Sequence, residues 1–176
     1  MGNNIKIGLR AMEPGDIDRM YQWENDPDLW DAGHTLAPYS RFQLEQYVLN
    51  YSGDVFGTGQ LRLMIDIIDN DTAETVGMID LYEVSNIHRR AGVGIMVIPS
   101  ARKKGVAAQA LRQLSAYCDK KLQLNQLWCE IETSNTASIR LFENEGFEKT
   151  GTKKMWIRVE KNYRDVYFFQ KILIKK

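Results

Sequence analysis

The sequence predicts an α/β protein built on one mixed, mostly antiparallel sheet of six to seven strands with about four helices. Three observations favour this fold class. Short apolar or alternating runs recur at the length and spacing typical of strands, and turn residues separate them. Amphipathic stretches long enough for helices lie between several of these runs. A strand–helix–strand unit over residues 92–132 requires a parallel pair joined by a crossover, whereas the flanking strands follow one another closely enough to be antiparallel.

The bulk composition is that of a globular chain, and we expect a single domain over residues 1–176. Hydrophobic residues make up 44% of the chain and charged residues 26%, which suits a full core. The 23 basic side chains balance 23 acidic ones, so we expect neither nucleic acid nor a membrane as a partner. Two cysteines form no disulfide framework, and two histidines make a metal site unexpected. These features, with no apolar segment of signal or membrane-spanning length, favour a cytoplasmic protein.

The first half of the chain gives clear start signals for its elements. Pro14-Gly15-Asp16 is typical of a helix start, and Ser40-Arg41-Phe42-Gln43 has the pattern of a capping box that begins a second helix. The turn signal Asp69-Asn70-Asp71 joins two strands. We therefore expect strands at 5–11, 61–68 and 74–83, and a loop at 53–59.

The second half alternates strands with helices before a final hairpin. Pro99 stops an apolar strand at 92–98, and a long helix then follows a basic segment. Gly146 is well placed as the left-handed residue that ends a short helix at 135–144. The buried stripe expected for the long helix consists of Ala107, Ala110, Leu111, Leu114, Cys118 and Leu122. The remaining strands are expected at 126–132, 155–159 and 165–174, with a turn at 161–163.

The segment between the strand at 92–98 and the long helix has the chemistry of an anion site. The first amides of a helix lack partners within it, and the helix dipole adds partial positive charge there. Gly105 lets a ligand approach the backbone closely, and Arg102, Lys103 and Lys104 add charge to a neutral protein. The spacing fits neither a Walker loop nor the Rossmann fingerprint. A solvated basic turn is the alternative interpretation of these residues.

Two motifs together resemble the GNAT acetyltransferases. Arg102-x-x-Gly105-x-Ala107 resembles the loop that holds the coenzyme A pyrophosphate in that family. Downstream, Asn135-x-x-Ser138-x-x-Leu141-Phe142-x-x-x-Gly146-Phe147 is similar to the family block that flanks the pantetheine arm. Leu9-Arg10 and Tyr163-Arg164-Asp165-Val166 are similar to the branch with spermidine and ribosomal-protein N-terminal acetyltransferases, and 87–99 is most similar to the spermidine enzymes.

The resemblance implies a sheet whose fourth and fifth strands, here 92–98 and 126–132, splay apart to admit the pantetheine arm. It also implies acetyl-CoA as the co-substrate, no metal, and a single GNAT domain. The cofactor-binding residues that follow are Met96, Val97 and Ile98 through their backbone, then Arg102, Lys103, Lys104, Gly105, Val106, Ala107, Asn135, Ser138 and Phe142.

Acetyl transfer to an amine needs a base, a donor for the thioester oxygen and a proton for the leaving thiolate. Glu130 resembles the base of ribosomal-protein alanine acetyltransferases, with Glu83 and His88 as alternatives. The amide of Met96 or Val97 is the expected donor. The family places its acidic tyrosine where this chain has Phe142, so either a water acts, or the thiolate leaves unassisted, or another phenol substitutes. The substitute phenols are Tyr82, Tyr163 and Tyr167, of which we take Tyr163 with Glu130 as the catalytic pair.

The acceptor site departs from the spermidine enzymes, whose acidic residues are replaced here by Leu36, Ala37, Ser40 and Gly92. Asp26, Asp28 and Asp31 still make the region acidic, and Trp30, Tyr39 and Glu83 are the candidate substrate contacts. We expect an N-acetyltransferase that acts on a small-molecule amine, a polyamine or a protein N-terminus. A non-catalytic acyl-CoA-binding module, supported by Phe142, and a plain interaction domain are the alternatives. Exposed edge strands favour a homodimer.

Overall fold

The computed structural model describes residues 5–27, 37–70, 72–159 and 161–173. The chain divides into two compact units, one of Ala11–Asp54 and one of Met1–Arg10 with Val55–Lys176. The first unit is helical, and the second carries almost the whole sheet. The single domain expected over residues 1–176 remains a prediction.

The helical unit begins where the sequence signals place it. The 3-10 turn η1 (Pro14–Asp16) leads into α1 (Ile17–Glu24), and α3 (Arg41–Leu49) starts at the expected capping box. The amide of Gln43 donates to Ser40 Oγ at 3.1 Å, and the amide of Ser40 donates to Gln43 Oε1 at 2.7 Å. Met20 of α1 and Leu44 and Val48 of α3 are buried, whereas Phe42 and Leu49 of α3 are exposed.

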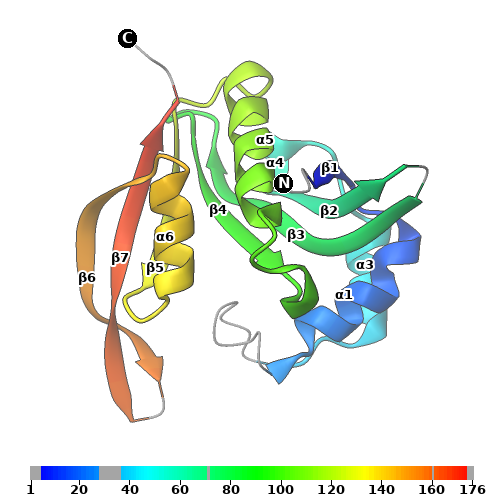
Figure 1. Cartoon of the computed structure of the whole chain (residues 1–176), viewed down its shortest axis with the longest axis horizontal. Helices are drawn as coiled ribbons and strands as arrows, with labels where there is room; N and C mark the ends of the chain where they lie inside the picture. Colours follow the sequence, from blue (N-terminus) through cyan, green and yellow to red (C-terminus); the bar gives the residue numbers. More distant parts are fainter. Residues whose placement is uncertain (1–4, 28–36, 71, 160, 174–176) are drawn as a thin grey trace. The chain divides into compact units, whose positions relative to one another are not determined.

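The sheet has the order β1-β2-β3-β4-β5-β7-β6, which confirms a mixed, mostly antiparallel sheet (Figure 1). Only β4 and β5 pair in parallel among the pairings that the described residues make. The strands are β1 (Lys6–Ala11), β2 (Leu61–Asp69), β3 (Thr72–Ser85), β4 (Arg90–Val97), β5 (Gln126–Glu132), β6 (Glu148–Val159) and β7 (Asn162–Ile172).

The helices α5 (Val106–Lys120) and α6 (Thr136–Asn144) lie over one face of this sheet (Figure 1). Leu111 and Leu114 of α5 are fully buried, in one apolar cluster with Leu127 of β5. The end of α6 is a Schellman motif, because the amides of Gly146 and Phe147 donate to the carbonyl oxygens of Glu143 and Phe142. Gly146 has φ +81°, as the sequence predicts for this position.

Two expectations for local structure are wrong. The predicted loop at 53–59 contains a short helix, α4 (Val55–Thr58), which forms because Val55 is buried in the sheet core. The predicted strand at 155–159 is only the end of β6, which starts at Glu148. The polar residues at its start carry no apolar alternation, since this edge strand pairs with β7 while most of its side chains stay exposed.

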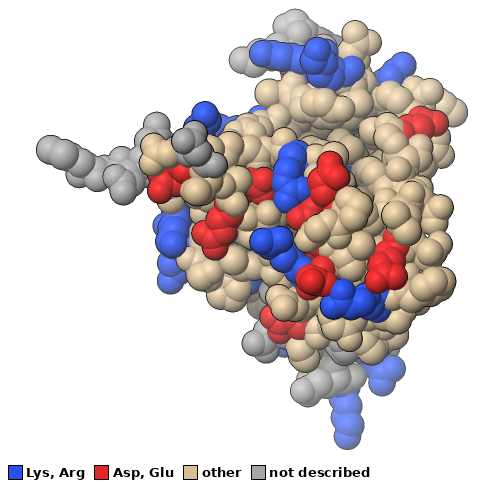
Figure 2. Space-filling model, turned by 90° about the vertical axis from the view of Figure 1, so that its right-hand side faces the viewer, with Lys and Arg blue, Asp and Glu red and all other residues tan. Residues whose placement is uncertain are grey.

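Charges of both signs lie on one face of the molecule. On the face drawn in Figure 2, Lys and Arg side chains alternate with Asp and Glu side chains, as the equal numbers of both signs in the sequence predict. Attraction for an anion must therefore come from a local site. Among the described residues, no helix combines the length and apolar character needed to cross a membrane.

Candidate acetyl-CoA and acceptor site

The two parallel strands at the centre of the sheet pair at one end only. Gly92 with Trp128 is the last β4–β5 pair, after Arg90 with Gln126 and Ala91 with Leu127. Beyond that point β4 continues along β3 and β5 continues along β7, each pairing on its outer side. The facing edges at 93–97 and 129–132 make no ladder with one another, and the separation is visible in Figure 1. The splay expected from the sequence is therefore present.

Backbone groups of β4 line this gap. The amide of Ile98 donates to the carbonyl oxygen of Val76 on β3 at 2.9 Å. Because amides alternate in direction along a strand, those of Val97 and Ile95 point away from β3 and toward β5. Met96, the partner of Met78, then directs its amide toward β3. Of the two expected donors, Val97 is thus the one whose amide faces the gap.

The loop before α5 is open to a ligand. Gly105 is the N-cap residue of α5 with φ +79°, and a Cβ placed there would meet no atom within 4 Å. No side chain caps the first turn of α5, so its amides keep the anion-binding capacity of a helix start. Lys103 and Lys104 are exposed beside it. These features fit a pyrophosphate group.

The side chains of Arg102 and Val106, which were expected to bind the cofactor, have other contacts in the structure. The Arg102 Nε donates to the carbonyl oxygen of Val97 at 2.9 Å and braces the end of β4 against the loop. The Val106 side chain is buried in the core, and Ala107 is half-buried, so these two residues offer the ligand their backbone.

The predicted contacts on α6 are occupied by local packing. Asn135 Oδ1 accepts the amide of Ser138 at 3.1 Å as the N-cap of α6. Phe142 is 3% exposed, and its ring meets that of Phe147 edge to face with centroids 4.9 Å apart. A phenylalanine suits this position because the Schellman motif brings these two residues into apolar contact.

An aromatic cluster closes the paired end of the gap. Leu127, Cys129 and Ile131 face the core, so alternation places Trp128 and Glu130 on the opposite face of β5. The Tyr82 ring meets Trp128 edge to face at 5.1 Å, and Trp128 stacks on Phe168 at 5.5 Å. A Cβ on Gly92 would lie 2.4 Å from the Tyr82 ring, so only glycine lets the ring lie across β4.

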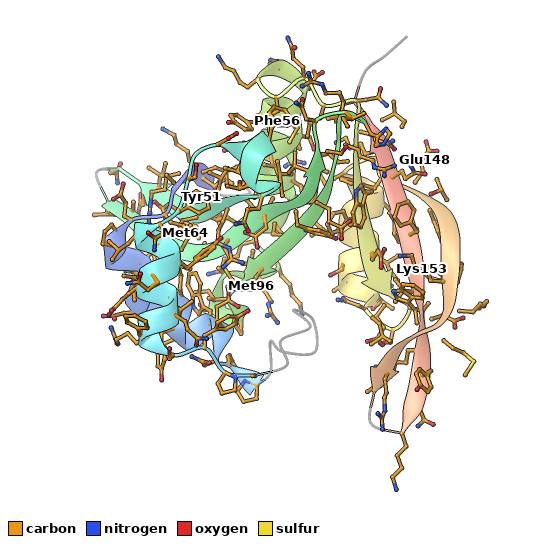
Figure 3. All side chains as sticks on the ribbon, turned by 180° about the vertical axis from the view of Figure 1, so that it is seen from behind. Tyr51, Phe56, Met64, Met96, Glu148 and Lys153 are labelled. Atoms are coloured by element: carbon orange, nitrogen blue, oxygen red, sulfur yellow. The ribbon has the colours of Figure 1, made fainter. Side chains whose placement is uncertain are left out.

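Glu130 forms an ion pair with Lys153 of β6 beside this cluster. The Glu130 side chain is 24% exposed and the Lys153 side chain 34% exposed. Lys153 Nζ lies 4.5 Å from the centroid of the Trp156 ring and 5.9 Å from that of Phe168. Figure 3 shows Met96 on β4 and Lys153 on β6 to either side of the region where β4 and β5 separate. The site thus holds a positive and a negative charge together.

The Tyr82 phenol keeps its proton at neutral pH. Burial raises the pKa of Tyr82 above its ordinary value, and the neighbouring Cys129, Glu130 and Glu83 raise it further. A protonated phenol beside Glu130 can donate a hydrogen bond, although its raised pKa makes it a weaker proton donor than an exposed phenol.

The alternative bases and phenols lie elsewhere. Glu83 is exposed with φ +47° at a register shift of β3, and His88 is exposed in the β3–β4 turn. Tyr163 is 54% exposed and lies on β7 beyond the last pair with β5, Glu132 with Val166. Tyr167 packs on Phe169, on the face of the sheet opposite to Glu130.

The predicted acceptor contacts are only partly described. Tyr39 is 42% exposed, and its amide and carbonyl group bond the side chain of Asn25 at 2.7 and 2.9 Å. Trp30 lies outside the described residues, as do Asp28, Asp31 and Leu36. In the described part of the chain, no three His, Cys, Asp or Glu side chains gather as they would to hold a metal ion.

Sequence reasoning missed Lys153 and Phe168. Phe168 is the cross-strand partner of Glu130, and Lys153 reaches Glu130 from the strand beyond. The alternation of side chains along β7 was a signal for which residues share a face. It does not indicate which residue of β5 or β6 lies opposite, because that depends on the register of strands far apart in sequence.

Comparison with known proteins agrees with this geometry. A model of the acetyltransferase (GNAT) domain matches residues 6–148. The spermidine N(1)-acetyltransferase of Vibrio cholerae is 24% identical over 93% of this chain and 91% of its own length. The L-amino acid N-acetyltransferase AaaT of Escherichia coli is 24% identical over 95% and 98%. A crystal structure of the V. cholerae spermidine enzyme in complex with CoA and spermine has a TM-score of 0.82 and 22% identity over 95% of both chains.

The chain belongs to the GNAT acetyltransferase family. Enzymes of this family use acetyl-CoA, and the chain is an N-acetyltransferase that transfers an acetyl group to an amine. The similarity in structure shows that the fold is shared. The roles of the binding and reacting residues are therefore argued from this chain's own residues.

Proposed function

We propose that acetyl-CoA binds along the gap between β4 and β5, with its pyrophosphate on the first amides of α5. The separation of the strands beyond the Gly92–Trp128 pair carries this proposal. A strand rises about 3.3 Å per residue, so the β4 edge from Gly92 to Val97 is about 17 Å long. Its open end leads to the Gly105 loop, and its closed end lies at the Tyr82–Trp128–Glu130 cluster. An extended arm held at the loop therefore points its far end at this cluster.

The chain's own groups fit such a ligand. The edge amides of β4 offer donors to the amide groups of the arm, in the manner of an added strand. Gly105, Lys103 and Lys104 surround the anion position, while Arg102 holds the carbonyl group of Val97 in place. Asn135 and Ser138 shape the start of α6 on the other side. The backbone contacts expected from Met96 and Ile98 are not available, because their amides point toward β3, so these two residues contribute apolar contacts only.

The acetyl group arrives activated as a thioester, which is the chemistry that acetyl-CoA supplies. The Val97 amide lies at the open end of the gap, about 17 Å from the cluster, so it serves as donor to a carbonyl oxygen of the pantetheine arm and not to the thioester. Glu130 Oε1 or Oε2 accepts the proton of the acceptor amine, with Glu83 and His88 as the alternatives. Tyr82 holds a proton for the sulfur, in place of the tyrosine that the family has at Phe142. Tyr163, the phenol chosen from sequence, is the competing acid.

The acceptor is a primary amine, with Trp30, Tyr39 and Glu83 as proposed contacts. Relatives act on spermidine and on L-amino acids, so both classes belong in a first screen. We place the reaction in the cytoplasm without a metal ion or a nucleic acid, and both cysteines are free and buried. A homodimer remains the expected assembly.

The cofactor site is tested by the isosteric pair Gly105→Asp and Gly105→Asn. Both residues tolerate positive φ, so they strain the loop alike and differ only in charge. We expect Asp to weaken acetyl-CoA binding at least about tenfold more than Asn, because a carboxylate repels the pyrophosphate. Isothermal titration calorimetry measures both affinities, and melting curves check that both variants fold. Equal affinities of the two variants for acetyl-CoA would show that the pyrophosphate does not bind at this loop.

Turnover is tested by thiol release from acetyl-CoA with polyamines, amino acids, aminoglycosides and N-terminal peptides. We expect release above the hydrolysis background with at least one amine. Tight acetyl-CoA binding without release from any amine would instead favour a binding module of the same fold.

A further inference from the structure

Lys153 is an unexpected feature of a site that must bind a cationic amine. Its ammonium group forms an ion pair with Glu130, the proposed base, and lies over the rings of Trp156 and Phe168. Ring faces favour a cation, so these contacts hold the Lys153 Nζ beside Glu130. The charge of Glu130 is therefore already balanced before an acceptor arrives.

Two other carboxylates among the described residues nearby are paired with cations other than Lys153. On the same part of the sheet, Arg164 pairs with Glu132 and Lys154 pairs with Asp165. A polyamine that approached Glu130 would bring several positive charges to a site that already contains one. The positive charges of the polyamine and of Lys153 would repel each other if both lay beside Glu130. If the polyamine displaced Lys153, the half-buried ammonium group of Lys153 would lose its carboxylate partner.

A zwitterionic acceptor meets both charges. We infer that the preferred acceptor carries a carboxylate next to its amine, as an α-amino acid does, with Lys153 binding the carboxylate and Glu130 the ammonium group. This inference rests on the proposed function of the site and names its substrate class. Each charge of the resting pair keeps an opposite partner when such a molecule binds.

The surroundings suit such a molecule. Lys153 and Glu130 are both partly exposed, so an acceptor can reach them from solvent. The stacked rings of Trp128 and Phe168 form an apolar surface next to Glu130, against which an amino-acid side chain can pack. Transfer converts an ammonium group and a thioester into an amide, a thiol and one released proton, so the carboxylate is unchanged and serves only for binding.

The test compares each L-amino acid with its own carboxamide as acceptor, with spermidine as the polycation. The amine of a carboxamide loses its proton more easily, so chemistry alone favours the amide and a preference for the acid must come from binding. We expect wild-type kcat/KM to be at least about tenfold higher for the acid. Lys153→Met should remove this preference by raising KM for the acids only, and should increase turnover of spermidine. Lys153→Arg should restore the preference for the acid.

Lys149→Met is the matched control, because Lys149 lies over the Tyr167 ring on the other face of the sheet, 4.2 Å from its centroid. It should leave the acid-to-amide ratio unchanged. Equal use of acids and amides by wild type would overturn the inference, as would an equal loss for both in Lys153→Met. Turnover of spermidine alone would overturn it while the proposed function stands. Tight acetyl-CoA binding without turnover of any amine would overturn both.

Discussion

Tyr82 gains its proposed role from what surrounds it. Gly92 leaves room for its ring, Trp128 holds the ring edge to face, and burial keeps the phenol protonated. An exposed phenol titrates near pH ~10 and is also protonated at neutral pH, so the surroundings of Tyr82 matter because they fix the position of its hydroxyl group. Phe142, by contrast, is fixed in apolar contact with Phe147, so the acid function has no place on α6 in this chain.

Tyr82→Phe keeps the ring and removes only the hydroxyl group. We expect kcat to fall by about tenfold or more with KM for acetyl-CoA unchanged, since acid catalysis contributes at least that much. Tyr163→Phe is the competing variant. Steady-state kinetics on both variants decides between them, and a loss of rate in Tyr163→Phe alone would reassign the acid to the β6–β7 hairpin.

Among the elements, the path of β4 determines the width of the gap. A Cβ on Gly77 of β3 would lie 2.2 Å from the carbonyl oxygen of Met96 and 3.1 Å from Val97 Cα. This close approach occurs beside the register shift between Ile65 and Asp66 of β2, opposite the same part of β3. The backbone that faces the proposed acetyl-CoA site is thus placed by its contact with β3.

Gly77→Ala should therefore displace β4 at the edge of the gap. We expect a loss of about 1–3 kcal/mol in the free energy of unfolding, together with weaker acetyl-CoA binding. Urea unfolding and calorimetry measure the two effects. Gly151→Ala on β6 is the control, because its Cβ would lie 3.8 Å from that of Phe168, an ordinary contact. Acetyl-CoA affinity as strong as that of wild type in Gly77→Ala would contradict this account of β4.

At the scale of the whole molecule, the core contains two thiols that water does not reach. Burial raises the pKa of Cys118 to about 12, and it also raises the pKa of Cys129, to which Glu130 contributes. A thiol in the unfolded chain titrates near ~8.5. The folded state therefore holds these protons more tightly. The corresponding stability is complete below pH ~8.5 and is lost as the pH rises toward the folded pKa.

The free energy of unfolding should fall between pH 7.5 and 9.5 by up to about 1.4 kcal/mol for each buried thiol. Cys118→Ala should show a smaller decrease than wild type, although it is less stable at both values because of the cavity. Lys171, whose pKa is lowered by burial, acts in the opposite direction in both proteins, so the comparison is between slopes. Urea unfolding under reducing conditions measures them, and parallel slopes would contradict the prediction.

Much of the fold, including the loop that precedes α5, followed from local signals. The capping box at Ser40, the left-handed Gly146 and the strand 126–132 are where the sequence placed them, because each depends on neighbouring residues. The start of β6 was missed because a polar edge strand has no apolar pattern. The short helix α4 was missed because burial of Val55 by distant residues stabilises it.

By itself the sequence determined the family, the order of the strands and the helix start at Gly105, since these depend on contiguous residues. Only the tertiary structure decided that Lys153 meets Glu130, that Tyr82 lies across Gly92, and that Tyr163 lies apart from both. Those relations depend on the register and separation of strands far apart in the chain, where a shift of one residue reverses the face of every side chain.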